Sequence, residues 1–349
     1  MLCTTLLALF LAPLCDAQTG AAPKVKPPQQ PDRLVLKTGT VITGNIEKLT
    51  TDEVTFKVTG KGTVHLPRTR IRAIQPKGQD VGIYGIKPPK TKGDEAPKTY
   101  VRYDKGQKKQ GVKGTLSTGV SRWFHPATNT TMFLVGAVHI GEQPYYDRVQ
   151  EILDQTDVVL FEAVRKSDGG MSDEQLASMT ALGKMQIAMK DALGLEFQKD
   201  AVKYKRDFWK NADVDFETLQ RHMKENKSSL PTDNPIVRIL LGLVTTLISA
   251  AKEDARANDL LRGQLAPVLA QADKILATKM KNLSSSLILF RNEKAMEFVQ
   301  KELKDGPKGR WLSLFYGAGH LPDLNKHLLK GGWKYQGADW ITAWHFTGR

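Results

Sequence analysis

Cysteine is nearly absent from this chain of 349 residues, which contains only Cys3 and Cys15. Two cysteines cannot form a cysteine-rich zinc module or the disulfide framework of a small secreted scaffold. Histidine is also scarce, with seven residues, so each one can be judged by its own surroundings. We therefore expect any metal site to use histidine and carboxylate ligands, and any catalytic nucleophile to be a group other than a thiol.

The remaining composition is that of a globular protein. Hydrophobic residues make up 40% of the chain and charged residues 25%, which excludes a disordered chain and leaves room for two domains. Lys and Arg outnumber Asp and Glu by 51 to 37, so the formal net charge is +14. Whether this charge indicates an anionic partner depends on where the cations lie.

The N-terminus has the pattern of a secretory signal peptide. An apolar run over 6–14 is followed by small residues at Cys15 and Ala17, which suits cleavage after Ala17. The run is too short to span a bilayer, so we expect no transmembrane helix in the mature chain. Residues 1–17 therefore predict a secreted, periplasmic or cell-envelope protein, with lipidation at Cys15 as the alternative.

Two linkers flank a small β-module. Residues 18–32, rich in Pro and Gln, predict a disordered linker, and residues 77–98 predict a basic linker of Pro, Gly and Lys. Between them, residues 33–76 contain five short β-type runs, a pattern that resembles small all-β barrels of the SH3-like or Sm-like kind. The basic linker is either a solvated connector or a patch for an anionic envelope polymer. It lacks interleaved aromatic residues and nucleic-acid motifs, so we do not expect a nucleic-acid partner.

Residues 99–349 predict an α/β (α+β) main domain. A hairpin over 120–135 leads into a helix over 144–153 and a strand over 158–161, and the strands of this βαβ unit should run parallel. From about 171 to 304 the pattern is helical, and its apolar stretch over 235–251 indicates a core helix rather than a membrane span. A strand over 311–316 and a helix over 322–329 then repeat the strand–turn–helix order. We therefore predict two related halves separated by a helical insertion.

Each half carries a Gly-x-x-His turn directly after its apolar strand. The first runs from Gly136 to His139, and the second runs from Gly317, through Gly319, to His320. In open α/β sheets, ligands bind at the carboxyl ends of the strands, where both histidines are expected. The glycines allow a sharp turn and a close approach of a substrate or an ion.

A carboxylate and a cation accompany the two histidines. Glu162 ends the apolar strand over 158–161, and its side chain should converge with His139 if their two strands are neighbours. Arg291 opens a helix after an apolar run. Taken singly, a surface or capping glutamate and a salt-bridged arginine explain these residues as well. Together with both histidines they favour a functional site.

These motifs resemble the TraB/Tiki family, which includes the GumN-like bacterial proteins, over about 115–349. The resemblance depends on the paired Gly-x-x-His motifs, Phe161-Glu162, Arg291-Asn292, and the block from Tyr204 to Asp213. It implies an α/β fold related to the erythromycin-esterase and ChaN-like superfamily. It also implies the metal-dependent protease activity of the animal Tiki proteins, which use manganese or cobalt. The N-terminal β-module is not part of the family pattern.

The resemblance assigns roles to individual residues of this chain. It implies His139 and His320 as metal ligands, Glu162 as a ligand or general base, and Arg291 as the cation of the pocket. Asp213 would be a further ligand or a group that supports one, and Asn292 would be another supporting group.

The implied chemistry is coherent. Two neutral imidazoles and one carboxylate, with an open position for water, suit a catalytic divalent metal such as Mn, Co or Zn. The ion would lower the pKa of bound water and polarise a carbonyl, and Arg291 would stabilise the oxyanion. We therefore predict an exported metal-dependent hydrolase that acts on a peptide or protein substrate. The alternatives are a non-catalytic peptide-, haem- or metal-sequestering protein, and a scaffold that binds envelope polymer.

Overall fold

The computed structural model describes residues 31–37, 40–50, 52–75, 95–106, 112–164, 193–226, 255–270 and 284–347. The predicted signal peptide, most of both predicted linkers and the predicted core helix over 235–251 lie outside these ranges. No helix among the described residues has the length and apolar character that crossing a membrane requires.

The N-terminal module is a five-stranded antiparallel sheet, and all five predicted strands are confirmed. Its strands are β1 (Asp32–Leu36), β2 (Val41–Leu49), β3 (Glu53–Val58), β4 (Thr63–Pro67) and β5 (Ile71–Gln75). They lie in the order β4-β3-β2-β1-β5. Alternate residues, including Leu34, Val54, Phe56 and Ile71, form a small core of their own, as the period of two predicts. The edge strands β4 and β5 do not pair with each other in the described residues, so closure into a barrel stays a prediction.

The main domain is built on a mixed sheet with the order β12-β10-β13-β8-β7-β14, and β6 also pairs with β7. Its strands are β6 (Val101–Lys105), β7 (Gly114–His125), β8 (Thr130–Ala137), β10 (Val158–Phe161), β12 (Trp209–Asn211), β13 (Trp311–Gly317) and β14 (Lys334–Phe346). Four adjacent strands of this sheet are parallel to one another, in the order β8, β13, β10 and β12. The next strand, β7, is antiparallel to β8. A mixed α/β fold is thereby confirmed.

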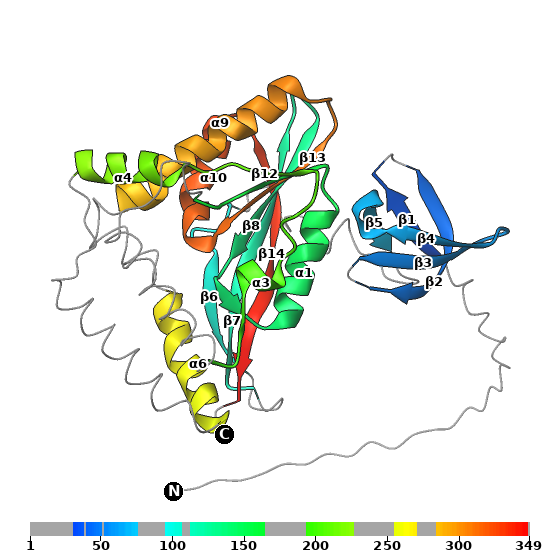
Figure 1. Cartoon of the computed structure of the whole chain (residues 1–349). Coiled ribbons are helices and arrows are strands. Elements are labelled where there is room, and N and C mark those ends of the chain that lie inside the picture. Colours follow the sequence, from blue (N-terminus) through cyan, green and yellow to red (C-terminus); the bar gives the residue numbers. More distant parts are fainter. Residues whose placement is uncertain are drawn as a thin grey trace, which may run out of the picture.

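Helices cover both sides of this sheet, and Figure 1 shows α1 and α10 on opposite sides of it. The described helices are α1 (Gln143–Asp154), α3 (Gln198–Ala201), α4 (Phe216–Glu225), α6 (Ala255–Leu269), α9 (Phe290–Asp305) and α10 (Leu321–Lys330). A proline stands in the first turn of α1 and of α10, where its missing N–H does no harm. The side chain of Asp215 caps α4 by accepting a hydrogen bond from the N–H of Thr218 at 2.7 Å.

The strand order differs from the sequence expectation in one respect that matters for the site. The strands that precede His139 and Glu162, β8 and β10, are not neighbours, because β13 pairs with both of them. The predicted parallel direction of β8 and β10 is confirmed. A strand that lies about 150 residues later in the chain therefore separates the two ends of the predicted βαβ unit, and it places the second Gly-x-x-His turn between His139 and Glu162.

Candidate functional site

The four parallel strands end in register at one edge of the sheet. Phe315 of β13 pairs with Val135 of β8 on one side and with Phe161 of β10 on the other, and Phe161 also pairs with Asn211 of β12. The residues directly after this row therefore leave the sheet side by side. These are the segments that carry His139, Glu162, Asp213 and His320, at the edge where ligands bind in parallel sheets.

Glu162 lies at the centre of the resulting cluster. Its Oε1 accepts a hydrogen bond from Nη2 of Arg291 at 2.6 Å, and its Oε2 accepts one from the backbone N–H of Gly317 at 2.5 Å. Nε2 of His320 lies 3.5 Å from Oε1. Burial alone raises the pKa of this carboxyl, but the His320 ring in its protonated form, Arg291 and the Gly317 N–H together hold the pKa well below its usual range. Glu162 is therefore a permanent carboxylate at neutral pH.

Arg291 joins two buried carboxylates. Its Nε and Nη2 donate to the two oxygens of Asp213 at 3.0 and 2.5 Å, and Nη2 also donates to Glu162. Nη1 donates to the carbonyl of Leu287, in the π-helical turn Ser285–Leu289 that directly precedes α9. Burial lowers the pKa of Arg291, but the bonds to Asp213 and Glu162 outweigh it and raise the pKa above its ordinary value. Each nitrogen of this guanidinium thus donates to the protein, and because Arg291 also lines the cavity beside Glu162, its predicted role towards a substrate oxyanion stays a prediction.

His320 is held in one tautomer by Asn292. The amide nitrogen of Asn292 donates to the backbone carbonyl of His320 and to Oδ2 of Asp323, each at 3.0 Å. The amide oxygen therefore faces Nδ1 of His320, 2.7 Å away, and must accept a proton from it. This assignment leaves Nε2, the nitrogen that faces Glu162, as the one that can take up a proton or a ligand.

A cavity of about 500 Å³ opens beside Glu162. It is lined by His139, Phe161, Glu162, Ala163, Val164, Phe197, Gln198, Lys199, Tyr204 and Arg291. The hydroxyl oxygen of Tyr204 accepts a hydrogen bond from Nε2 of Gln198 at 2.9 Å, so its own proton is available to the cavity. Burial raises the pKa of Tyr204 to about 12, which keeps this hydroxyl protonated at neutral pH. The cavity thus combines a carboxylate, an imidazole and a hydroxyl donor with an apolar wall.

The glycines of both Gly-x-x-His turns are explained by close packing. A Cβ atom on Gly317 would lie 3.2 Å from Oε2 of Glu162, in the space that the carboxylate needs to reach the Gly317 N–H. A Cβ atom on Gly136 would meet the carbonyl of Gly119 at 3.0 Å and Leu321 at 3.1 Å. Gly319 lies in the single 3-10 turn Ala318–His320, which leads into α10.

The structure brings the sequence-predicted residues together at this edge. Glu162, Arg291, Asp213, Asn292 and His320 form one hydrogen-bonded or ion-paired cluster. His139 lines the same cavity as Glu162.

Sequence reasoning missed three further groups, which are Gln198, Lys199 and Asp323. Gln198 and Lys199 form the first turn of α3, which directly follows the short strand β11 (Glu196–Phe197). β11 pairs with β9 (Ile140–Gly141), the strand next to His139. No periodicity could indicate elements this short. Asp323 could have been noted as an acid in the first turn of the helix after His320.

The predicted metal can be tested against this geometry. When two ligand atoms each lie near 2.1 Å from one ion at a tetrahedral angle, the distance between the two atoms is about 3.4 Å. Oε1 of Glu162 and Nε2 of His320 are 3.5 Å apart, which is close to this distance. A histidine that ligates a metal also commonly donates its other N–H to a fixed acceptor, as His320 does to Asn292. However, both oxygens of Glu162 already accept hydrogen bonds, one of them from a cation.

Within the part of the chain that the structure describes, no group of three or more His, Cys, Asp or Glu side chains is placed to hold a metal ion. The described donors therefore supply two facing ligands without a third, and we derive no reaction step through a metal. The metal site with His139 as a ligand stays a prediction.

We compared the chain with family models, with curated proteins and with solved structures. No match was found in any of the three comparisons. The assignment of a function therefore depends on the geometry of this site and on the sequence motifs.

Proposed function

We propose that this protein is an exported hydrolase of the TraB/Tiki type, which cleaves an amide or ester bond in the cavity beside Glu162. The observation that carries the proposal is the pair formed by Glu162 and His320. Nε2 of His320 lies 3.5 Å from a carboxylate that is ionised at neutral pH, and Asn292 holds the opposite nitrogen. A structural ion pair needs neither a fixed tautomer nor an adjacent cavity, whereas a proton-accepting pair needs both.

The Glu162–His320 pair is the base in this proposal. A water molecule that hydrogen-bonds to Glu162 loses its proton to the pair as the oxygen attacks the substrate carbonyl. The proton comes to rest on Nε2 of His320, because Nδ1 already carries one. The imidazolium that results is stabilised by Glu162, whose carboxylate lies 3.5 Å from the same nitrogen.

Tyr204 and His139 complete the reaction from the other walls of the cavity. The hydroxyl proton of Tyr204 is free to donate to the carbonyl oxygen of the substrate, where negative charge develops. His139 is the second imidazole of the site, and it gives a proton to the leaving amine or alkoxide. Arg291 and Asn292 are positioning residues, because they act through Glu162 and His320.

Metal dependence is a separate part of the proposal. A divalent ion such as Mn, Co or Zn would lower the pKa of the attacking water. The residues available to hold it are Glu162, His320 and His139, and Glu162 would have to exchange its bond to Arg291 for a bond to the ion. The exported location, the closed β-barrel and the two related halves belong to the same proposal, since each rests on the sequence pattern.

The test is hydrolysis of peptide and ester substrates by the mature protein and by Glu162→Gln and His320→Gln. Loss of a general base lowers turnover by about 10²–10⁴-fold, so both variants should lose at least about 100-fold. Two matched controls are His125→Ala, at the opposite edge of the sheet, and Glu302→Gln, a buried glutamate that pairs with Lys210 and Arg310. Turnover by Glu162→Gln equal to that of the wild type would refute the proposal.

A second candidate function is peptide binding without hydrolysis. It is favoured by the apolar wall of the cavity, which includes Phe161 and Phe197, and by the complete hydrogen bonding of Glu162. A binding protein would retain a peptide in stoichiometric amounts and release no cleavage product. It would also bind that peptide with similar affinity after Glu162→Gln.

A further inference from the structure

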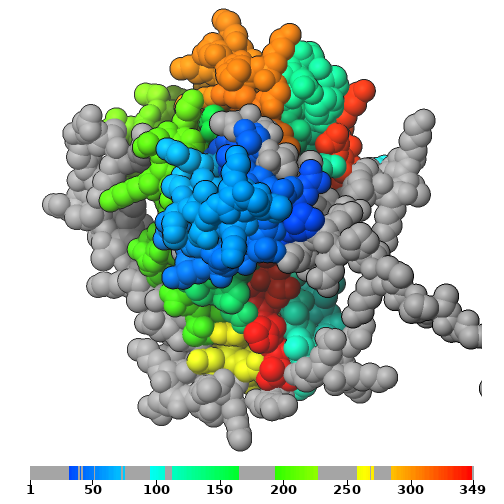
Figure 2. Space-filling model, turned by 90° about the vertical axis from the view of Figure 1, so that its right-hand side faces the viewer, coloured from blue at the N-terminus to red at the C-terminus, as the bar shows by residue number. Residues whose placement is uncertain are grey.

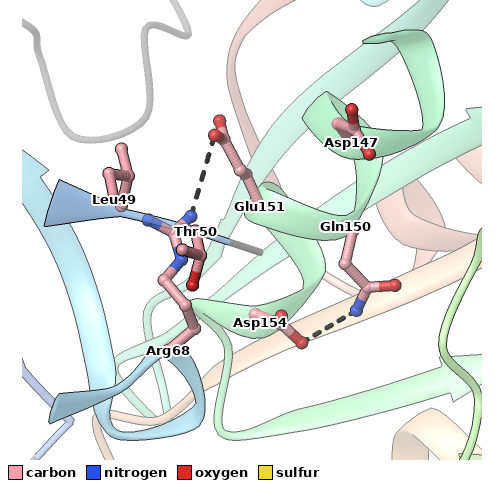
Figure 3. A pocket seen from close by; sticks show the side chains of 7 residues that line it. All are labelled: Leu49, Thr50, Arg68, Asp147, Gln150, Glu151 and Asp154. Atoms are coloured by element: carbon pink, nitrogen blue, oxygen red, sulfur yellow. Dashed lines mark hydrogen bonds and ion pairs between the residues drawn. The ribbon is translucent and has the colours of Figure 1, made fainter. Parts of the chain in front are cut away.

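A second cavity, of about 220 Å³, lies where the N-terminal module meets helix α1. Leu49, Thr50 and Arg68 line it from the module, and Asp147, Gln150, Glu151 and Asp154 line it from α1, as Figure 3 shows. In Figure 2, which views the molecule from the side of the module, the blue module overlies the larger domain. We call this space the junction cavity.

The junction is held by contacts on either side of the cavity. Nζ of Lys37 donates to the carbonyl of Thr156 at 2.5 Å and lies 3.8 Å from the ring centre of Phe208. Nζ of Lys203 donates to Asp52 at 2.6 Å. Val35 also packs against the core of the main domain. The two walls of the cavity are therefore held against each other by polar and apolar contacts.

Arg68 is the unusual residue of this cavity. It is 5% exposed, and its Nη1 has no hydrogen-bond partner among the described residues. The nearest carboxylate is Glu151, whose Oε1 lies 3.8 Å from Nη2, beyond hydrogen-bond distance. A buried cationic nitrogen without an acceptor costs free energy, and native proteins rarely leave such a group unsatisfied.

The carboxylates of the cavity already have partners, so they do not supply the missing acceptor. Asp154 accepts hydrogen bonds from Gln150 at 2.9 Å and from Arg206 at 3.1 Å. Oε2 of Glu151 accepts one from Arg148 at 2.9 Å. What the cavity lacks is an oxygen acceptor for Arg68 next to several acidic side chains.

We propose that the junction cavity binds a free α-amino acid, with its carboxylate on the guanidinium of Arg68 and its ammonium group on Glu151 and Asp147. A simple anion would satisfy Arg68 but would be repelled by three carboxylates. A simple cation would be attracted by the carboxylates but would leave Arg68 unpaired. A zwitterion with both groups on one carbon matches the two charges of the site, and the volume suits a molecule of this size.

The test compares amino acids with their decarboxylated counterparts by calorimetry on the full-length mature protein. L-leucine and L-arginine supply an apolar and a basic side chain, and 3-methylbutylamine and agmatine are the matched amines without the carboxylate. A hydrogen bond to a charged group contributes about 10- to 100-fold in affinity. We therefore expect at least one of the amino acids to bind about 10-fold or more tightly than its amine.

The variant Arg68→Met identifies the residue responsible. It should abolish the preference for the amino acid over the amine, while Glu151→Gln should weaken both. Arg102→Met, which removes an exposed arginine of the main domain, is the control and should keep the preference. Should Arg68→Met fail to fold, as judged by near-UV circular dichroism, Arg68→Lys replaces it and should reduce the preference. The proposal is overturned if neither amino acid binds, if the amines bind equally well, or if the preference survives at Arg68→Met.

Discussion

Replacement of Arg291 by methionine tests the central electrostatic claim about the site. The substitution leaves the Asp213 side chain, which is fully buried, and the Glu162 side chain, which is 15% exposed, without their shared cation. Removal of one partner of a buried ion pair costs about 3–5 kcal/mol, because the remaining charge stays desolvated. We therefore expect Arg291→Met to lower the free energy of unfolding by about 3–5 kcal/mol at pH 8, measured by denaturant unfolding.

The loss of stability in Arg291→Met should depend on pH. In the wild type the pKa of Glu162 lies below its unfolded value of about 4.3, so its contribution to stability is present above that pH and is lost as the pH falls further. Arg291→Met removes one of the groups that lower the pKa of Glu162, so this pKa is higher in the variant than in the wild type. The folded variant therefore takes up a proton at a higher pH than the wild type does, and its deficit in stability should shrink as the pH falls from 8 towards 4.

A matched control and a second substitution separate this mechanism from general damage. Lys294→Met removes the cation of an exposed pair with Glu297 and should change stability by less than about 1 kcal/mol. Arg291→Met combined with Asp213→Leu should be more stable than Arg291→Met alone, because one of the unpaired charges is gone. A deficit below about 1 kcal/mol at pH 8, or one that stays constant down to pH 4, would refute the reasoning.

Three further predictions address His139, His320 and the glycine that begins the second Gly-x-x-His turn. Asn292→Leu removes the acceptor of the Nδ1 proton of His320, so the turnover number should fall about 10- to 100-fold with little change in KM. Asn325→Leu is the control at another buried amide, and a pH–rate profile of Asn292→Leu that equals that of the wild type would contradict the role of Asn292. Gly317→Ala places a methyl group 3.2 Å from Oε2 of Glu162 and should displace that carboxylate, with a loss of activity larger than that of Gly331→Ala; equal activity of the two variants would show that the close approach is unimportant. Metal analysis of the mature protein should find a stoichiometric divalent ion that His139→Ala and His320→Ala both lose, and unchanged metal content in both variants would exclude these residues as ligands.

The local elements of the site could be predicted from the sequence because their signals are local. Proline in the first turn marks α1 and α10, and the apolar run before Glu162 predicts β10 with the bounds that the structure has. The five strands of the N-terminal module follow from period-two alternation between turn residues. Such patterns indicate which elements exist, and they place Glu162 and His320 at strand ends, without any knowledge of the partners.

The pairing of the elements could not be predicted in the same way. Strand order depends on contacts between residues far apart in the chain, and no periodicity encodes it. β13 lies between β8 and β10, and Arg291 meets Asp213 across 78 positions of sequence. The sequence therefore suggests that Arg291 faces a substrate, but it gives no sign of the bonds that Arg291 makes to Asp213 and Glu162.

One segment connects the two cavities. Between α3 and β12, Tyr204 lines the cavity beside Glu162 and packs its ring on Phe161. Its neighbour Lys203 bonds to Asp52 of the N-terminal module and, through its backbone N–H, to Gln150 of the junction cavity. Because Lys203 and Tyr204 are consecutive in the chain, the segment that carries the Tyr204 hydroxyl is also the segment that the N-terminal module contacts. The N-terminal module thereby contacts the scaffold of the proposed active site, although the sequence pattern that resembles the TraB/Tiki family does not include it.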